Sequence, residues 1–146
     1  MTEAIKQRQE EIIDEFELLE GNLEMALDYL IELGDGLEHL EDIYRVDENI
    51  VKGCQSKVWM TADYTNNKVR FKADANTAIT KGLVSLLVRV LNNADPDDIV
   101  KSEIYFPKQI GMDRFIGTQR SNGFASMIKH MKMQAVQFSA KRESSV

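Results

Sequence analysis

The sequence predicts a single α+β domain in which several helices pack on a small antiparallel sheet. Apolar residues recur with a helical period up to about residue 34 and again from about residue 77, but with a period of two between residues 58 and 73. No internal repeat or low-complexity linker divides the chain. A chain of 146 residues with 43% hydrophobic residues is long enough to bury about two thirds of its unfolded surface. One domain spanning 1–146 is therefore expected.

Two helices are expected in the first 34 residues. The spacing of Ile5, Ile12 and Phe16 predicts an amphipathic helix that ends near Gly21. Asn22 is a good N-cap for a second helix, which Gly34 can close as a left-handed residue. The apolar stripe of this second helix comprises Leu23, Leu27, Leu30 and Leu33. Residues 35–56 are expected to be irregular.

A β-hairpin should follow. Residues 58–62 and 69–73 alternate apolar and polar side chains, and Asp74 falls on the polar side of that alternation. Asn66 and Asn67 lie between the two strands, and asparagine tolerates the positive φ of a tight two-residue turn.

The C-terminal half should contain three helices. The first runs from residue 76 or 77 to residue 91 and should be buried. Asp95 and Pro96 open a short helix to about Lys101, and a loop containing Pro107 and Gly111 follows. Thr118 should cap the last helix, and its tail, 139–146, should fray. The inner face of that helix comprises Phe124, Ile128, Met131, Ala135 and Phe138.

The net charge of −6 conceals a strong division along the chain. Residues 1–48 hold 16 acidic against three basic residues, whereas residues 49–146 hold eight acidic against 15 basic ones. This favours either a solvated acidic helix pair or a polarised face that guides a protein partner. The basic residues form no arginine-rich tract, so nucleic acid is not an expected partner.

No membrane association is expected either. No uncharged run approaches the length of a membrane helix, and the acidic N-terminus does not resemble a signal or transit peptide. A cytoplasmic location is therefore predicted.

Cys54 is the only cysteine, which excludes an intrachain disulfide, a CxxC redox pair and a cysteine-rich metal site. His39 and His130 are the only histidines and show no metal-binding spacing, so no metal is expected. A cysteine hydrolase would need one of these histidines as its general base, and neither has supporting context.

The segment IVKGCQSKVWM places Gly53 and Cys54 immediately before the first strand. Glycine lets the backbone turn there and can present a thiol at a loop tip, although unpaired cysteine is also a common small core residue. Gln55, Ser56 and Lys57 follow the thiol and can position it or its partner. At least partial shelter of the thiol is expected, because an exposed reactive thiol oxidises.

Five blocks of the sequence form a pattern together: YLIELGDGL (29–37), YRVDENIVKGCQSKVWM (44–60), KGLVSLL (81–87), DPDDIV (95–100) and RSNGFASM (120–127). This pattern resembles the SufE family of sulfur-acceptor proteins. The likeness spans roughly residues 29–135, and GCQS before VW is its most specific part.

The resemblance implies an α+β fold like that of the IscU scaffolds and makes Cys54 the acceptor of sulfur. It implies a pyridoxal-phosphate cysteine desulfurase of the SufS type as donor, and a SufB-type iron-sulfur scaffold downstream. Such a protein carries a persulfide and activates the desulfurase, but it is not an independent enzyme and binds no cofactor itself. The sequence leaves open whether it is a monomer or a homodimer.

Two further residues are predicted to serve the site. Arg120 falls in the first turn of the last helix, where a positive charge opposes the helix dipole. It can stabilise the Cys54 anion or contact the donor, or it can simply bond a loop carbonyl. Gly82 inside a helix indicates close approach of another backbone, which can be the Cys54 loop or simply a neighbouring packed helix. The alternative function is a thiol-independent regulatory adaptor that acts through the acidic N-terminal helices.

Overall fold

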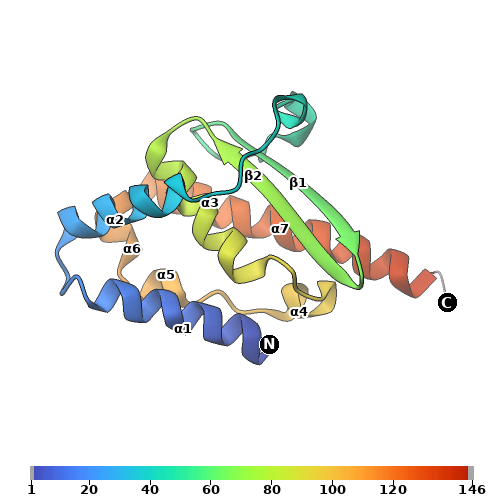
Figure 1. The fold of residues 1–146 in the computed structure, drawn as a ribbon, viewed down its shortest axis with the longest axis horizontal. Coiled ribbons are helices and arrows are strands. Elements are labelled where there is room, and N and C mark those ends of the chain that lie inside the picture. The colour runs from blue at the N-terminus through green and yellow to red at the C-terminus, as the bar shows by residue number, and fades with distance from the viewer. Residues whose placement is uncertain (1, 145–146) are drawn as a thin grey trace.

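The computed structural model describes residues 2–144 and confirms the predicted α+β class. A long C-terminal helix runs behind a two-stranded hairpin and a central helix (Figure 1). The N-terminal helix lies on the side of the molecule away from the hairpin. The elements in chain order are α1 (Glu3–Glu17), α2 (Leu23–Asp35), the 3-10 helices η1 (Asp42–Tyr44) and η2 (Asp47–Asn49), β1 (Val58–Thr65), β2 (Lys68–Ala75), α3 (Ala78–Leu91), α4 (Pro96–Lys101), α5 (Phe106–Gln109), α6 (Met112–Ile116) and α7 (Thr118–Ser144).

The central helix α3 organises the core. It contacts α1, α2, α7 and strand β2, and its apolar side chains are buried on almost every side. An amphipathic helix that met only one layer would keep a wide polar face. The apolar character of residues 78–91 therefore follows from the central position of α3. None of the helices within residues 2–144 is long and apolar enough to cross a membrane.

The first two helices are present, but the C-terminal end of each differs from the prediction. Helix α1 stops at Glu17, because Glu20 and Gly21 both adopt positive φ and reverse the chain. Asn22 caps α2 as expected, since its side chain accepts the Met25 amide at 2.9 Å. Gly34 is not the closing residue: it lies inside the helix, where its lack of a side chain lets α3 approach.

The hairpin is confirmed, with Val58 opposite Ala75 and Thr65 opposite Lys68. Asn66 and Asn67 take φ values of 55° and 64° at the turn, as a tight turn of mirror-image type requires. Asp74 departs from the predicted alternation because it is only 6% exposed. Its carboxylate pairs with Arg45 at 2.6 Å and with Lys81 at 3.6 Å, which joins the segment between α2 and β1 to the hairpin and to α3.

The expected loop around Pro107 and Gly111 contains two short helices instead. Pro107 lies in the first turn of α5, where its missing amide hydrogen costs nothing. Gly111, at φ 64°, then redirects the chain into α6. Helix α7 begins at Thr118 itself, and the capping position belongs to Gly117, whose carbonyl accepts the Ser121 amide.

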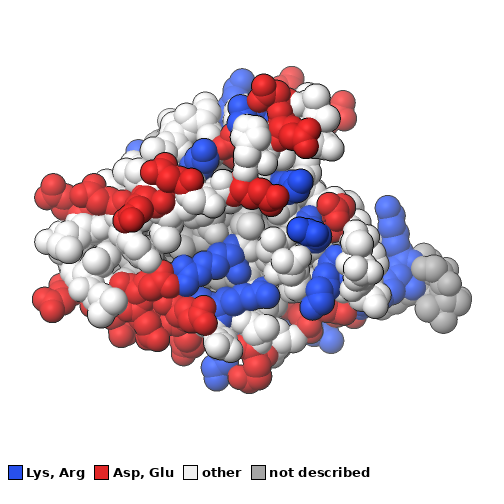
Figure 2. All heavy atoms as spheres, viewed as in Figure 1, with Lys and Arg blue, Asp and Glu red and all other residues white. Residues whose placement is uncertain are grey.

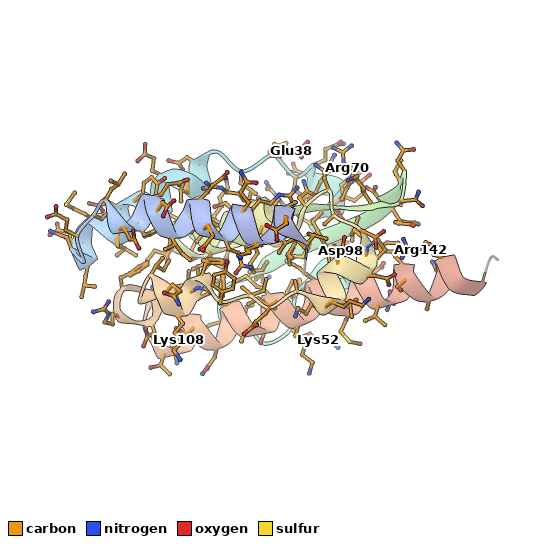
Figure 3. All side chains as sticks on the ribbon, turned by 90° about the horizontal axis from the view of Figure 1, so that it is seen from below. Glu38, Lys52, Arg70, Asp98, Lys108 and Arg142 are labelled. Atoms are coloured by element: carbon orange, nitrogen blue, oxygen red, sulfur yellow. The ribbon has the colours of Figure 1, made fainter. Side chains whose placement is uncertain are left out.

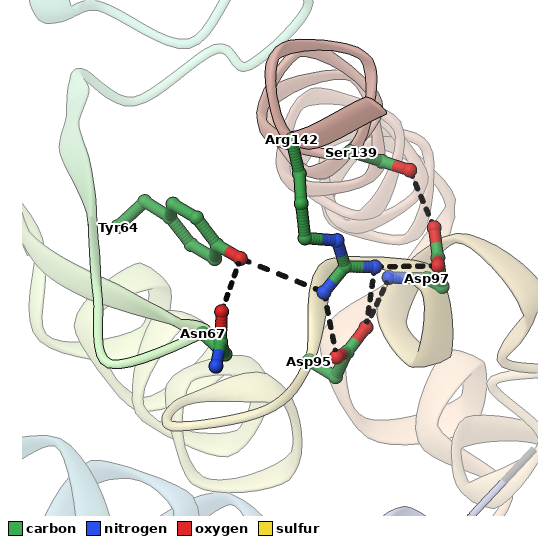
Figure 4. A network of polar contacts seen from close by, with 6 residues as sticks. All are labelled: Tyr64, Asn67, Asp95, Asp97, Ser139 and Arg142. Atoms are coloured by element: carbon green, nitrogen blue, oxygen red, sulfur yellow. Dashed lines mark hydrogen bonds and ion pairs between the residues drawn. The ribbon is translucent and has the colours of Figure 1, made fainter. Parts of the chain in front are cut away.

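The prediction that residues 139–146 fray is wrong for 139–144, and residues 145 and 146 lie outside the described part. The last turns of α7 are anchored to the start of α4 (Figure 4). Arg142 pairs with Asp95 at 2.8 Å and with Asp97 at 2.5 Å, and the Ser139 hydroxyl donates to Asp97. This cluster gives the helix a fixed end where the sequence alone shows only a polar tail.

Candidate functional site

Cys54 lies on the wall of a pocket of about 430 Å³, the place where four parts of the fold meet. The loop before β1 carries the thiol, the start of α3 forms a second wall, and the junction between α6 and α7 closes the rest. The residues that line the pocket with Cys54 include Thr80, Leu83, Ile116, Arg120, Gly123 and Met127. The thiol therefore faces a defined cavity.

Gly53 shapes the loop that carries the thiol. Its φ of +93° lies in the left-handed region, which side chains other than glycine rarely adopt. A β-carbon at this position would also lie 3.0 Å from the Ser126 β-carbon on α7. The Val51 amide donates to the Val58 carbonyl at 2.8 Å and closes the base of the loop. Gly53 thus provides the turn that the sequence predicts and also lets the loop rest against α7.

The Cys54 thiol is half-buried and donates a hydrogen bond to the Gly123 carbonyl, with Sγ and oxygen 3.4 Å apart. Burial raises the pKa of this thiol above its ordinary value, because a thiolate loses more hydration energy than a neutral thiol. The resting site therefore holds the protonated form. The predicted partial shelter is present, and any gain in reactivity must come from a change in this environment.

Gly123 is a site residue that the sequence analysis missed. It is buried in α7, and a β-carbon there would lie 3.6 Å from the Cys54 sulfur. A glycine inside a helix costs about 1 kcal/mol relative to alanine, which was the signal that drew attention to Gly82. The same argument applied to the SNGF segment would have identified the acceptor of the Cys54 hydrogen bond.

Arg120 lines the same pocket as Cys54, so the structure brings these two predicted residues together. The residue is exposed, and its guanidinium donates to the Ile116 carbonyl at 3.1 Å. That carbonyl ends α6, so the arginine spans the junction between α6 and α7. In the resting structure Arg120 thus bonds a main-chain carbonyl, the simplest of its predicted roles, although this carbonyl lies at a helix end and not in a loop.

The three residues after Cys54 separate into two groups. Gln55 and Ser56 line the pocket, whereas Lys57 does not. Lys57 instead fixes the start of β1, because its amide donates to the Asn76 side chain at 3.0 Å and its carbonyl accepts the Asn76 amide at 3.1 Å. Lys57 therefore acts on the site only through the hairpin.

Of the two predicted neighbours of Gly82, a packed helix is present and the Cys54 loop is not. A β-carbon on Gly82 would lie 2.8 Å from Leu30 Cγ, and one on Gly34 would lie 2.7 Å from the Gly82 nitrogen. The close neighbour of Gly82 is therefore α2. The two glycines let α2 and α3 pack backbone against backbone, which positions Thr80 and Leu83 on the pocket wall.

A second, shallower groove of about 490 Å³ lies on the other side of the Cys54 loop, between Gly53 and α7. Lys52, Lys129 and half-buried His130 line it, and burial lowers the His130 pKa. Lys52 points away from the body on the side where α7 runs, as Lys108 does (Figure 3). Two exposed lysines thus flank the Cys54 loop on this side, together with the carboxylate of Glu48.

The acidic residues gather elsewhere. Figure 2 shows them over α1 and α2 and over the 3-10 helices η1 and η2, as the charge division of the sequence predicts. The corner between α1 and α2 also exposes apolar side chains, with Leu18 81% exposed. Within residues 2–144, no three His, Cys, Asp or Glu side chains are close enough together to hold a metal ion.

Known proteins match this chain in sequence, at about one third identity, or in fold. A SufE-like protein of Synechocystis is 34% identical over 109 residues, which cover 75% of this chain and 69% of that protein. One of Rhizobium meliloti is 32% identical over 132 residues and covers 86% of this chain and 93% of that protein. Both are described as uncharacterized.

A plant relative and a solved structure extend the comparison. The Arabidopsis "SufE-like protein 1, chloroplastic/mitochondrial" is 32% identical over 111 residues, which cover 75% of this chain and 30% of that protein. The cytoplasmic location expected here therefore stays a prediction. The solution structure of a hypothetical protein from Thermus thermophilus has a TM-score of 0.73 at 19% identity, covers 89% of this chain and 94% of that one, and so has the same fold.

The family model named SufE and described as an "Fe-S metabolism associated domain" matches residues 10–135. This range contains the whole pocket, from the Cys54 loop to the first turns of α7. The chain therefore belongs to the SufE family and has a role in Fe-S metabolism.

Proposed function

We propose that this protein accepts sulfane sulfur on Cys54 from a cysteine desulfurase and passes it on for iron-sulfur cluster assembly. The observation that supports this most is the position of Cys54: a single thiol, half-buried, on the wall of a pocket large enough for a second sulfur atom. Membership of the SufE family supports a desulfurase as the partner.

The transfer step is a thiol-disulfide exchange. The Cys54 thiolate attacks the outer sulfur of the donor's persulfide, the donor's S–S bond breaks, and the donor cysteine leaves as a thiolate. Cys54 then carries a persulfide, and no external oxidant or reductant is needed. Within this chain no second cysteine can resolve that persulfide, so the sulfur must leave to another protein.

The resting geometry indicates where the rate must come from. A thiol with an ordinary pKa of about 8.5 is only about 3% ionised at pH 7, and burial lowers the Cys54 fraction further. Docking that moves Cys54 away from the Gly123 carbonyl would remove the acceptor that favours the thiol. Holding the two sulfurs in line then replaces the entropy cost of a bimolecular encounter, which is worth many kcal/mol. The donor protein thus completes the site.

The acidic surface of α1 and α2 favours a second candidate function, a regulatory adaptor that needs no thiol. The two functions separate on a Cys54→Ser variant incubated with a SufS-type desulfurase and cysteine. A sulfur acceptor predicts that wild type stimulates alanine formation and the serine variant does not. Full stimulation by the serine variant would contradict the acceptor and favour the adaptor. A SufB-type scaffold as recipient and a cytoplasmic site of action complete the proposal.

A further inference from the structure

A chain of three hydroxyl groups runs from the molecular surface to the Cys54 pocket. The Ser56 and Thr77 hydroxyl oxygens are 3.2 Å apart, and the Thr77 hydroxyl donates to Thr80 at 2.8 Å. The Thr77 hydroxyl has one proton, and it donates this proton to Thr80. In the bond between Ser56 and Thr77, the Ser56 hydroxyl is therefore the donor. All three dipoles therefore point inward, and each bond polarises the next.

This hydroxyl network is unusual because the Thr77 side chain takes part in it instead of capping helix α3. Thr77 occupies the N-cap position of α3, but its side chain makes no capping hydrogen bond to the helix. Such a cap is typically worth about 1 kcal/mol. The local arrangement thus forgoes a helix cap and directs the hydroxyl at Thr80 instead.

Thr80 is the last hydroxyl of this network and lies inside the pocket. It is only 4% exposed, whereas the other polar residues that line the pocket are exposed or half-buried. In the described part of the chain, no acceptor receives the Thr80 hydroxyl proton. The remaining buried lining is apolar and comprises Leu83, Ile116 and Met127. A buried donor without an acceptor, in an apolar wall, is suited to an anion that arrives only during the reaction.

We propose that the Thr80 hydroxyl donates a hydrogen bond to the outer sulfur of the persulfide on Cys54 and holds this anion in the pocket between loading and delivery. The assignment rests on the sulfur-acceptor function proposed above. Arg120 lies at the exposed edge of the same pocket and is bonded to Ile116, so Thr80 supplies the sheltered contact. Thr80 is a contact to the transferred sulfur, and Ser56 and Thr77 are positioning residues that act through it.

The test loads Cys54 chemically, with inorganic polysulfide, and confirms by intact mass that one sulfur atom has been added. The persulfide is then alkylated over a range of pH in wild type and in three variants. Thr80→Val removes the hydroxyl at nearly constant volume, and Thr80→Ser keeps it. Thr61→Val removes a threonine hydroxyl from the middle of β1, outside the pocket.

We expect the midpoint of alkylation to rise by about one pH unit in Thr80→Val, a tenfold change for the loss of one hydrogen bond to an anion. Thr80→Ser and Thr61→Val should match wild type. A Thr80→Val profile that superimposes on wild type would overturn the proposal, and so would a wild type that takes up no sulfur from polysulfide. If Thr80→Val fails to fold, Ser56→Ala should show a smaller shift in the same direction, and no shift would again overturn it.

Chemical loading separates this result from the proposed function. If the desulfurase fails to load Cys54, the acceptor function is wrong while the Thr80 contact is still measured. If loading by the desulfurase succeeds and the Thr80→Val profile is unchanged, the Thr80 contact alone is wrong.

Discussion

The Cys54 thiol donates to the main-chain carbonyl of Gly123 across 3.4 Å, so the candidate nucleophile rests against an acceptor that favours its neutral form. Most activated cysteines lie beside cations or helix N-termini, which lower the thiol pKa. Here the start of α7 and Arg120 border the same pocket, but the sulfur is directed one turn further along the helix. In the resting structure the surroundings of Cys54 thus favour the unreactive thiol over the thiolate.

Alkylation of Cys54 in the free protein should require a higher pH than alkylation of an ordinary thiol. Burial raises the Cys54 pKa in the folded state only, so the chain unfolded in urea provides the control. Because the thiol is harder to ionise in the folded state, its contribution to the free energy of unfolding is fully present below the ordinary thiol pKa of about 8.5. This contribution is lost as pH rises through the folded pKa. Iodoacetamide kinetics across pH 6 to 10 measure the pH midpoint of alkylation in the folded and in the unfolded chain. A folded midpoint at or below the unfolded one would refute it.

Gly82→Ala should destabilise the fold, because the new methyl group would overlap Leu30 on α2. Overpacking of this kind costs about 1–3 kcal/mol, more than the roughly 1 kcal/mol that alanine gains in helix propensity. Gly36→Ala is the matched control: Gly36 has φ −86°, and its nearest contact would be the Leu33 oxygen at 3.5 Å. Urea denaturation compares the two variants, and equal stability would show that α2 and α3 do not pack as described.

Gly53→Ala should slow sulfur uptake by Cys54 more than it lowers thermal stability. The loop can relieve the strain by moving away from α7, which displaces the thiol but leaves the core unchanged. A left-handed residue other than glycine costs about 1–2 kcal/mol, and the contact with Ser126 adds to this. The double variant Gly53→Ala, Ser126→Ala should recover part of the uptake rate, since it removes the overlap with the Ser126 hydroxyl while the φ strain and the 3.0 Å contact with the β-carbon remain. No recovery would place the loop elsewhere than against Ser126.

Arg142→Ala should loosen the end of α7 without affecting the Cys54 pocket. Hydrogen bonds from Arg142 lower the Asp95 pKa, so this contribution is present above the ordinary aspartate pKa of about 3.9 and is lost as pH falls through the folded value. The protection of amides near residue 139 against exchange, relative to the intrinsic rate at each pH, should therefore fall in acid in wild type, and should already be low at pH 7 in the variant. Lys129→Ala, an exposed change in the middle of α7, is the control. Equal exchange in the two variants would show that the ion pairs of Arg142 with Asp95 and Asp97 do not hold the end of α7.

Local sequence patterns were sufficient for the elements whose causes are local. Two alternating runs around Asn66 and Asn67 predict the hairpin, and Asn22 and Asp95 predict the helix starts that their side chains cap. The turn at Gly53 before β1 was likewise predicted from its own segment. In each case the residues that determine the structure lie within a few positions of one another.

The features that were missed depend on residues distant in the chain. Gly123 lies 69 positions from Cys54, and Asp95 lies 47 positions from the Arg142 that fixes the helix end. Taken alone, Gly34 suggests a helix end, and Gly82 suggests a contact with a loop or another helix. Only the packing of α2 on α3 shows that each glycine faces the other helix. Asp74 is buried only because Arg45 and Lys81 reach it from two other elements. Pattern alone cannot supply such pairings.

The central claim is that Cys54 itself receives sulfur from another protein. The direct test incubates the protein with a SufS-type desulfurase and cysteine, then measures intact mass after rapid acid quenching. The account predicts a gain of one sulfur atom that maps to the Cys54 peptide, and no gain in Cys54→Ser. If the desulfurase is shown to carry its own persulfide while wild-type Cys54 stays unmodified, the account is contradicted.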